Sequence, residues 1–260
     1  FLDKLNLILN NNKKVYASTM ASEMGKPMTE GILEIEKCVL LLDYYKNNVV
    51  NLVTENLQNT RLNQRIVYRP LGIILGIMPW NFPFWQVFRF IIPALLSGNT
   101  VLLKHSLNVQ KCAQYIQEMF SQLDSPANIY QNLRLSNNKT TKLIKHKSVS
   151  AVSFTGGSKA GSIVAKMAGH HLKKVLLELG GSDPFIILSD ADINRAISSC
   201  ISGRLLNAGQ SCISVKRIIV TTDIYDLFLK RLILRLKKIE LGNSQDSFDL
   251  GPMVSKKARL

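Results

Sequence analysis

Cys212 is the cysteine of this sequence whose surroundings point to chemistry. It closes the string Gly209-Gln210-Ser211-Cys212, in a turn between an expected helix and an expected strand. A thiolate there could attack an aldehyde carbon and later leave from a thioester, because sulfur is a soft nucleophile and a good leaving group. The remaining cysteines lie among apolar positions of helical spacing and are interpreted as small buried hydrophobes: Cys38, Cys112 and Cys200.

The spacing of the cysteines and histidines is not that of a metal site. The 4 cysteines form no C-x-x-C pair and stand at no metal-ligand spacing from the 4 histidines. We therefore expect no bound metal, and we expect reduced thiols of the kind kept in the cytoplasm.

Two further strings carry polar groups suited to the same reaction. They are Pro79-Trp80-Asn81-Phe82-Pro83 and Leu177-Glu178-Leu179-Gly180-Gly181. Attack on an aldehyde leaves an oxyanion, which the Asn81 side-chain amide and the Cys212 backbone N–H could stabilise. The Glu178 carboxylate could then activate water to hydrolyse the thioester. The alternatives are an Asn81 amide that stabilises a turn and a Glu178 that is a surface charge at a strand end.

A glycine-rich turn suggests phosphate binding. Thr155-Gly156-Gly157-Ser158-Lys159-Ala160-Gly161 lies between an expected strand and an expected helix. Glycines let the backbone approach a pyrophosphate, and the N–H groups at the helix N-terminus supply positive potential. Taken alone, this string fits a simple tight turn equally well, since it is not the G-x-G-x-x-G pattern.

The elements that position these groups alternate between strand and helix. Two long helices are predicted first, over 2–24 and 29–53, and then a loop over 54–63. Strands are predicted over 71–77, 100–104, 127–131, 148–154 and 174–179, with helices between them, and strands over 185–188 and 215–221 follow. This alternation predicts an α/β fold with a parallel sheet and helices on both faces. Ligands gather at the carboxyl ends of such strands, where the turns 78–83, 104–107 and 155–161 fall.

Charge and hydropathy exclude two classes of partner. The formal charge is +15, but the lysines are spread in ones and twos without interleaved aromatic residues, which disfavours nucleic acid. The longest apolar runs are well short of the roughly 20 residues that cross a bilayer. No secretory signal opens the sequence. The protein is therefore expected to bind neither nucleic acid nor membrane.

Taken together, the strings resemble the aldehyde dehydrogenase superfamily, in the same order and over essentially the whole chain. Further strings are similar to the succinate-semialdehyde dehydrogenase branch: Met24-Gly25-Lys26-Pro27, Glu36-Lys37-Cys38, Tyr68-Arg69-Pro70-Leu71-Gly72, Leu103-Lys104-His105 and Gly181-Ser182-Asp183-Pro184-Phe185. The resemblance implies a Rossmann-type NAD(P)-binding domain over 1–178, with an extended segment over 57–70 near the oligomerisation arm. It implies part of a second α/β catalytic domain over 179–260, which carries the nucleophile.

The resemblance also implies the cofactor, NAD or NADP. Lys104 would contact the adenosine ribose, and the nicotinamide end would lie near Trp80 and Leu179. The pyrophosphate would lie on the glycine-rich turn, at Gly156, Gly157, Ser158 and Gly161. This sequence departs from the family in two places: Leu107 replaces a glutamate common in NAD-preferring members, and Gly157 stands where a serine usually follows the glycine.

Arg89 is the residue from which we infer the substrate. It stands where succinate-semialdehyde enzymes commonly carry an arginine for the distal carboxylate, and a guanidinium fork suits that group. The alternative is a surface or interhelix ion pair. The reaction implied is oxidation of succinate semialdehyde to succinate through a Cys212 thiohemiacetal and thioester, with the hydride passing to the cofactor. Rival interpretations are a broad aliphatic aldehyde dehydrogenase and an inactive nucleotide-binding remnant.

The sequence is also shorter than the family's members. It begins at Phe1 and ends at Leu260, so a fragment is expected, with little or no activity alone and with exposed apolar surface after Gly180. Members of the family form homo-oligomers. A truncated chain is not expected to form the same assembly.

Overall fold

The chain is described by a computed structural model over residues 1–53, 56–59, 64–124, 126, 128–242 and 250–259. It divides into two compact units. Unit 1 comprises residues 1–16 and 32–178, and unit 2 comprises residues 17–31 and 179–260. Residues 17–31, which the sequence assigned to the first domain, thus belong to the second unit.

A five-stranded parallel sheet forms the centre of unit 1. Its strands are β3 (Ile73–Met78), β4 (Thr100–His105), β5 (Tyr130–Asn132), β6 (Val149–Thr155) and β7 (Lys174–Glu178), in the order β5-β4-β3-β6-β7. Each neighbouring pair is parallel. The chain moves outward from β3 in one direction and from β6 in the other. The sheet therefore has a topological switch point between β3 and β6.

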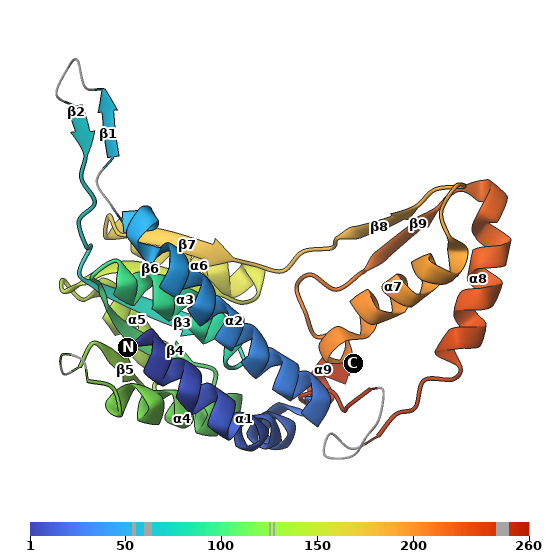
Figure 1. Cartoon of the computed structure of the whole chain (residues 1–260), viewed down its shortest axis with the longest axis horizontal. Coiled ribbons are helices and arrows are strands. Elements are labelled where there is room, and N and C mark those ends of the chain that lie inside the picture. Colours follow the sequence, from blue (N-terminus) through green and yellow to red (C-terminus); the bar gives the residue numbers. More distant parts are fainter. Residues whose placement is uncertain (54–55, 60–63, 125, 127, 243–249, 260) are drawn as a thin grey trace. The chain divides into compact units, whose positions relative to one another are not determined.

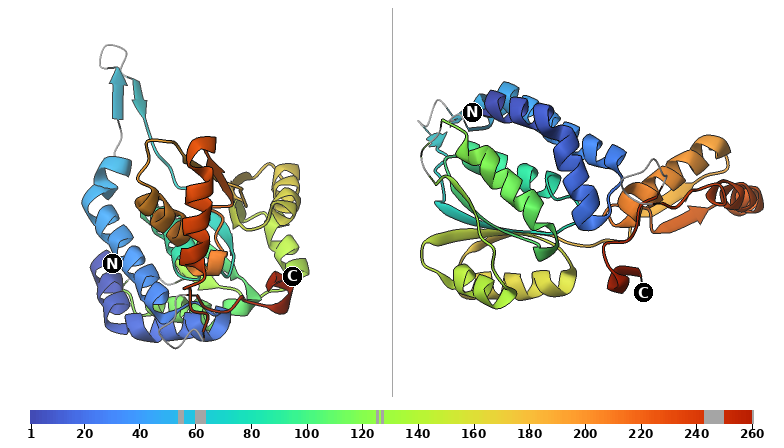
Figure 2. Two further views of the ribbon diagram at one scale, coloured as in Figure 1. Left: turned by 90° about the vertical axis from the view of Figure 1, so that its right-hand side faces the viewer. Right: turned by 90° about the horizontal axis from the view of Figure 1, so that it is seen from below.

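Helices cover both faces of this sheet. The connections contain α3 (Trp85–Leu96), η1 (Leu107–Val109), α4 (Gln110–Ser121), α5 (Asn137–Lys145) and α6 (Ser158–His170). Parallel crossovers are right-handed, so the change of direction at the switch point puts α3 and α4 on one face and α5 and α6 on the other. Figure 2 shows α4 and α6 on opposite sides of the sheet. The arrangement confirms the predicted fold class.

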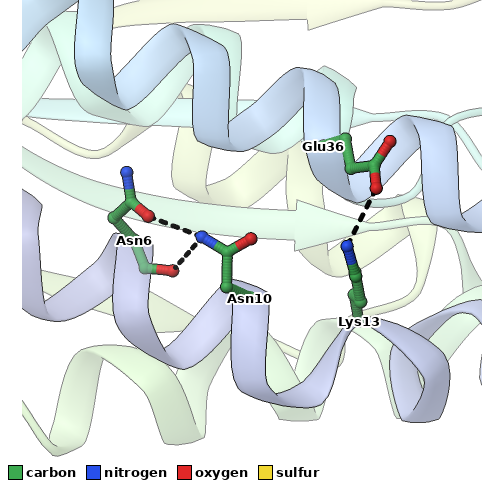
Figure 3. A network of polar contacts seen from close by, with 4 residues as sticks. All are labelled: Asn6, Asn10, Lys13 and Glu36. Carbon is green, nitrogen blue, oxygen red and sulfur yellow. Dashed lines mark hydrogen bonds and ion pairs between the residues drawn. The ribbon is translucent and has the colours of Figure 1, made fainter.

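The two long helices are α1 (Leu2–Met24) and α2 (Met28–Val53). The Tyr16 ring of α1 lies 5.2 Å from the Phe84 ring and 5.3 Å from the Tyr115 ring of α4. A polar layer joins α1 to α2, where Lys13 Nζ donates to Glu36 Oε1 at 2.9 Å (Figure 3). Asn10 extends this layer along α1 by donating to the side chain of Asn6 (Figure 3).

Three segments differ most from the prediction. The polar segment expected to be a loop contains β1 (Asn56–Asn59), which pairs antiparallel with β2 (Gln64–Ile66). Strand propensity depends strongly on the partner strand, so a polar run gives little warning of it. Residues 54–55 and 60–63 of that predicted loop lie outside the described residues. β5 starts later than expected because Asn128 has a left-handed φ of 64°. The sequence predicts a small helix near 141–146, but α5 starts earlier, at Asn137, because the Ser136 hydroxyl caps it by accepting from Lys139 N.

Unit 2 is built around a smaller parallel sheet (Figure 1). Strands β8 (Pro184–Ile187) and β9 (Arg217–Val220) pair in parallel, and the other elements of this part of the chain are α7 (Ile193–Leu205), η2 (Leu206–Gly209), α8 (Thr222–Leu236) and α9 (Lys256–Arg259). The core of the unit contains Ile187, Ile197, Cys200, Phe228 and Leu232. Large apolar side chains are also exposed here, as expected after Gly180: Ile186, Leu188, Ile213, Ile219, Leu234 and Leu241.

Two kinds of feature are absent from the described residues. No helix among them combines the length and apolar character that a membrane crossing requires. In the same part of the chain, no three histidine, cysteine or acidic side chains gather as metal ligands would.

Candidate active site

The carboxyl edge of the large sheet collects most of the predicted site residues of unit 1. β3 ends at Met78, just before Trp80 and Asn81, and β7 ends at Glu178. In the sheet register Met78 pairs with His105, and Thr155 pairs with Glu178. Because parallel strands end at the same edge, the turns after β3, β4 and β6 and the end of β7 lie there together.

Glu34 braces the turn that carries Asn81. Its side chain is only 4% exposed. Its Oε1 accepts hydrogen bonds from Phe84 N at 2.8 Å and from Trp85 N at 2.9 Å. Phe84 is the N-cap of α3 and contributes no side-chain cap of its own. The Glu34 carboxylate, which comes from α2, therefore accepts hydrogen bonds from N–H groups at the start of α3. Its negative charge also interacts favourably with the positive end of the α3 dipole. Sequence reasoning missed this residue.

Glu34→Ala is expected to lower the free energy of unfolding by about 2–3 kcal/mol, because it leaves buried N–H groups unsatisfied. Glu36→Ala is the matched control, since this carboxylate stands on the same helix and pairs with Lys13. That pair is partly exposed, and its loss should cost less than about 1 kcal/mol. Urea denaturation measures both values. Equal effects of the two substitutions would contradict the capping role.

His105 fastens the same turn to the end of β4. The imidazole is 1% exposed. Its Nδ1 lies 2.9 Å from Ser106 N, and its Nε2 lies 3.0 Å from the Pro83 carbonyl oxygen. Nδ1 also lies 3.3 Å from the Met78 carbonyl oxygen, but the shorter contact is with Ser106 N, which can only donate, so Nδ1 accepts and the proton lies on Nε2. A neutral imidazole therefore ties the turn to the strand.

Arg89 and Glu178 form an ion pair that the sequence did not predict between these two residues. Arg89 Nη2 lies 3.2 Å from Glu178 Oε2, and the two side chains are 31% and 48% exposed. Arg89 was expected to bind the substrate and Glu178 to activate water, so the structure brings the two groups together. A pair with this exposure is held weakly and can exchange partners.

The glycine-rich turn presents the amino end of α6. Gly156 N donates to the Glu178 carbonyl at 3.0 Å. A Cβ at Gly156 would lie 2.7 Å from the Phe154 ring, whereas a Cβ at Gly157 would have nothing within 4 Å. Gly157 is the N-cap of α6, and the first-turn N–H groups begin at Ser158. Gly161 is buried one turn later. The positive end of this helix is thus open to an anion beside Gly157.

Lys104 lines an open pocket beside that turn. Its side chain is 8% exposed, and burial lowers the pKa of its ammonium group. The other walls come from β3, α5, β6 and α6: Ile77, Thr140, Ile144, Phe154, Ile163 and Val164, among others. Leu107 follows in η1 and is 55% exposed. A buried cation in a largely apolar pocket suits a flat, partly anionic ligand.

Cys212 lies in a turn of unit 2. Ser214 N donates to the Ser211 carbonyl at 3.3 Å across this turn. Lys216 Nζ donates to the Cys212 carbonyl at 3.1 Å and also to the carbonyl of Gly181. The ammonium of Lys216 thereby connects the cysteine turn to the segment that begins at Leu179. Cys212 is partly exposed, whereas Cys38, Cys112 and Cys200 are buried as expected.

The backbone before Cys212 is strained, and hydrogen bonds hold it in place. Asn207, Ala208 and Gly209 all have left-handed φ values, of 55°, 55° and 72°. For Ala208 this costs about 1–2 kcal/mol. Glu30 Oε2 accepts from Asn207 N at 2.8 Å, and Gln210 Oε1 accepts from Val254 N at 3.0 Å. Backbone strain that surrounding contacts hold in place is a feature of functional sites.

The predicted site residues thus fall into two groups. Trp80, Asn81, Arg89, Lys104, Gly156, Gly157, Ser158, Gly161 and Glu178 belong to unit 1, and Leu179 and Cys212 belong to unit 2.

Comparison with known proteins places the chain in one family. The model of the aldehyde dehydrogenase family matches residues 1–260. A curated protein of Synechocystis sp., named probable succinate-semialdehyde dehydrogenase (NADP(+)), is 40% identical over 250 residues, covering 95% of this chain and 55% of that protein. Succinate-semialdehyde dehydrogenase (NADP(+)) 1 of Mycobacterium tuberculosis is 39% identical over 248 residues, covering 94% of this chain and 54% of that protein.

Solved structures agree. The succinic semialdehyde dehydrogenase of Streptococcus pyogenes, solved with NADP+ as the cofactor, matches with a TM-score of 0.95 and 34% identity, covering 98% of this chain and 57% of that one. The chain spans about half the length of the curated relatives it matches. From its sequence and its fold, this chain belongs to the aldehyde dehydrogenase family.

Proposed function

We propose that the protein to which this chain belongs oxidises succinate semialdehyde to succinate, with NADP as the hydride acceptor and Cys212 as the nucleophile. The proposal is carried mainly by one observation. Asn81, Lys104, the glycine-rich turn and Glu178 meet at the carboxyl edge of one parallel sheet, next to its switch point. The names of the relatives supply the substrate and the cofactor.

The residues present fit a dinucleotide. The open amino end of α6 at Gly157 suits a pyrophosphate, because N–H groups and the helix dipole both favour negative charge there. The pocket beside Lys104 suits the adenosine, with the ammonium within reach of ribose oxygens. Leu107 carries no carboxylate to repel a 2′-phosphate, which supports NADP. The nicotinamide, when bound, accepts a hydride from the carbon that the thiol has attacked.

The protein's own groups account for the other steps. The Cys212 thiolate adds to the aldehyde carbon, and the new oxyanion accepts hydrogen bonds from the Asn81 amide and the Cys212 N–H. Loss of hydride from this thiohemiacetal leaves a thioester on Cys212. Glu178 then takes a proton from water, the oxygen adds to the thioester carbon, and the thiolate leaves as succinate forms.

The Arg89–Glu178 ion pair gives Arg89 a second role in this scheme. The distal carboxylate of the substrate would compete with Glu178 for the guanidinium, because both are carboxylates and the existing pair is partly exposed. Once the substrate holds Arg89, Glu178 is released to act on water. An acidic aldehyde would thereby prepare the base for its own hydrolysis.

Gly157→Ser is expected to tighten NADP binding by several-fold. A serine side chain has room there and adds a hydroxyl that can donate to the pyrophosphate. Gly169→Ser is the matched control, since a Cβ at Gly169 also has nothing within 4 Å and the residue stands near the other end of α6. Isothermal titration with NADP measures both. An unchanged affinity in Gly157→Ser, or an equal gain in both variants, would speak against a pyrophosphate on this turn.

A single-turnover experiment tests the proposed function. The purified full-length protein to which this chain belongs is mixed with succinate semialdehyde and NADP, NADPH is followed by absorbance, and the protein is examined by peptide mass spectrometry. We expect a succinyl thioester on Cys212 that requires NADP and accompanies NADPH formation. Failure to form this thioester under conditions in which NADP binds would reject the proposed function.

A further inference from the structure

The segment between Asp124 and Glu178 contains no acidic residue. It carries nine lysines and arginines and three histidines within those 53 positions. Exposed basic side chains are usually balanced by acidic neighbours. A segment of this length without a carboxylate therefore carries a high positive charge that nothing within it compensates. The linear sequence shows the basic residues only in ones and twos.

The fold gathers part of this charge at the amino edge of the sheet. α5 and α6 run antiparallel to the strands, so both helices end at the edge opposite the proposed active site. There Lys145, Lys166, His170 and His171 line an open pocket, together with Ile163 and Met167. We call it the basic pocket. No carboxylate is among the residues that line it.

The cations around the basic pocket are close enough to influence one another. The rings of His170 and His171 are 5.1 Å apart and nearly perpendicular. Lys173 Nζ donates to the carbonyl of His146 at 2.6 Å, which holds a further charge nearby. Desolvation and the charges of His170, Lys173 and Lys145 lower the pKa of His171. A bound anion would relieve this repulsion.

We propose that the basic pocket binds a compact polyanion of two or three linked phosphates. Two lysines and two histidines around one concavity match a small, multiply charged ligand, and lysines bind phosphate as point charges. Nucleic acid fits less well, because the one tyrosine and the one phenylalanine of this segment, Tyr130 and Phe154, are both buried, so apart from the histidines no ring is exposed for base stacking.

Binding of inorganic tripolyphosphate to the purified chain tests the proposal without any dehydrogenase activity. Isothermal titration at fixed ionic strength should give one site per chain. Lys145→Gln/Lys166→Gln should weaken this binding about tenfold or more. Lys230→Gln/Lys237→Gln, which removes the same charge from exposed positions on and just after α8, should leave it within about twofold of the unaltered chain. Circular dichroism establishes that each variant is folded.

The pH dependence supplies a second readout. A phosphate ligand favours the imidazolium form of His171, so the contribution of the histidines to the affinity should rise as the pH falls from about 8 to about 6, although the ligand itself loses negative charge over this range. His170→Gln/His171→Gln should flatten this dependence while retaining binding through the lysines.

Four outcomes would overturn the proposal. They are equal weakening in both lysine variants, displacement of tripolyphosphate by NADP, tighter binding of duplex DNA than of tripolyphosphate, and tighter binding of phosphatidylserine vesicles. The last outcome would direct attention to Leu172, which is 96% exposed beside these cations.

Discussion

Cys212→Ser is expected to abolish acylation of the protein by p-nitrophenyl esters, with a fall in rate of about a thousandfold or more. In this reaction the thiolate attacks the ester carbonyl, p-nitrophenolate leaves, and a thioester forms on Cys212. A serine hydroxyl in the same turn is far less ionised than a thiol near neutral pH, so it cannot replace the thiolate. Release of p-nitrophenolate measures the rate, and no cofactor is needed.

Cys200→Ala provides the matched control. This thiol stands 12 positions earlier in the same unit but is 1% exposed, and burial raises its pKa. A buried, protonated thiol is inert, so the control should react at the rate of the unaltered chain. Loss of acylation in Cys200→Ala, or persistence of it in Cys212→Ser, would show that the reactive group lies elsewhere.

The sequence sufficed to predict the sheet and the edge at which most of the proposed site residues lie. The runs before Trp80, Lys104 and Gly156 are short, apolar and bounded by turn residues, and the helical periodicity between them is clear. Strand alternation then requires a parallel sheet, and a parallel sheet has one carboxyl edge. The local sequence pattern and the overall fold favour the same elements here, so the prediction of the sheet was reliable.

The hydrogen bonds that Glu34 and Glu30 accept could not be predicted, because each joins residues far apart in the chain. Glu34 caps a helix that begins 51 positions later, and Glu30 accepts from Asn207, 177 positions away. Neither carboxylate has a local motif that would distinguish it from a solvated helix charge. Only the packing of α2 determines which of its acidic residues meets an unsatisfied N–H.

The left-handed backbone at Ala208 could not be predicted from the sequence either. Alanine is a strong helix former and gives no local sign of a positive φ. The turn before Cys212 was predicted from Gly209, whose φ of 72° suits glycine. The strain at its neighbour is imposed by the contacts of Asn207 and Gln210, which are properties of the folded unit.

Arg89→Gln is expected to slow acylation of Cys212 by mono-p-nitrophenyl succinate about 30-fold or more while changing the rate with p-nitrophenyl butyrate less than about threefold. The first ester carries the distal carboxylate, and the second is its neutral counterpart. A lost charge-assisted bond of this kind is worth about 2–3 kcal/mol, which corresponds to the larger factor. Arg89→Lys should recover part of the rate, because it restores the charge without the two-pronged geometry.

The comparison of the two esters separates three roles for Arg89. If Arg89 binds the substrate, only the acidic ester loses rate. If it serves only to hold Glu178 through the 3.2 Å ion pair, neither acylation rate changes, and only the later hydrolysis of the thioester does, with either acyl group. If the ion pair merely supports the fold, both rates fall together with the free energy of unfolding. If the substrate releases Glu178, two results are required. In Arg89→Gln only the acidic ester loses acylation rate, and in the unaltered chain the succinyl thioester is hydrolysed faster than the butyryl thioester. Because the same guanidinium would serve both carboxylates, that difference in hydrolysis should disappear in Arg89→Gln.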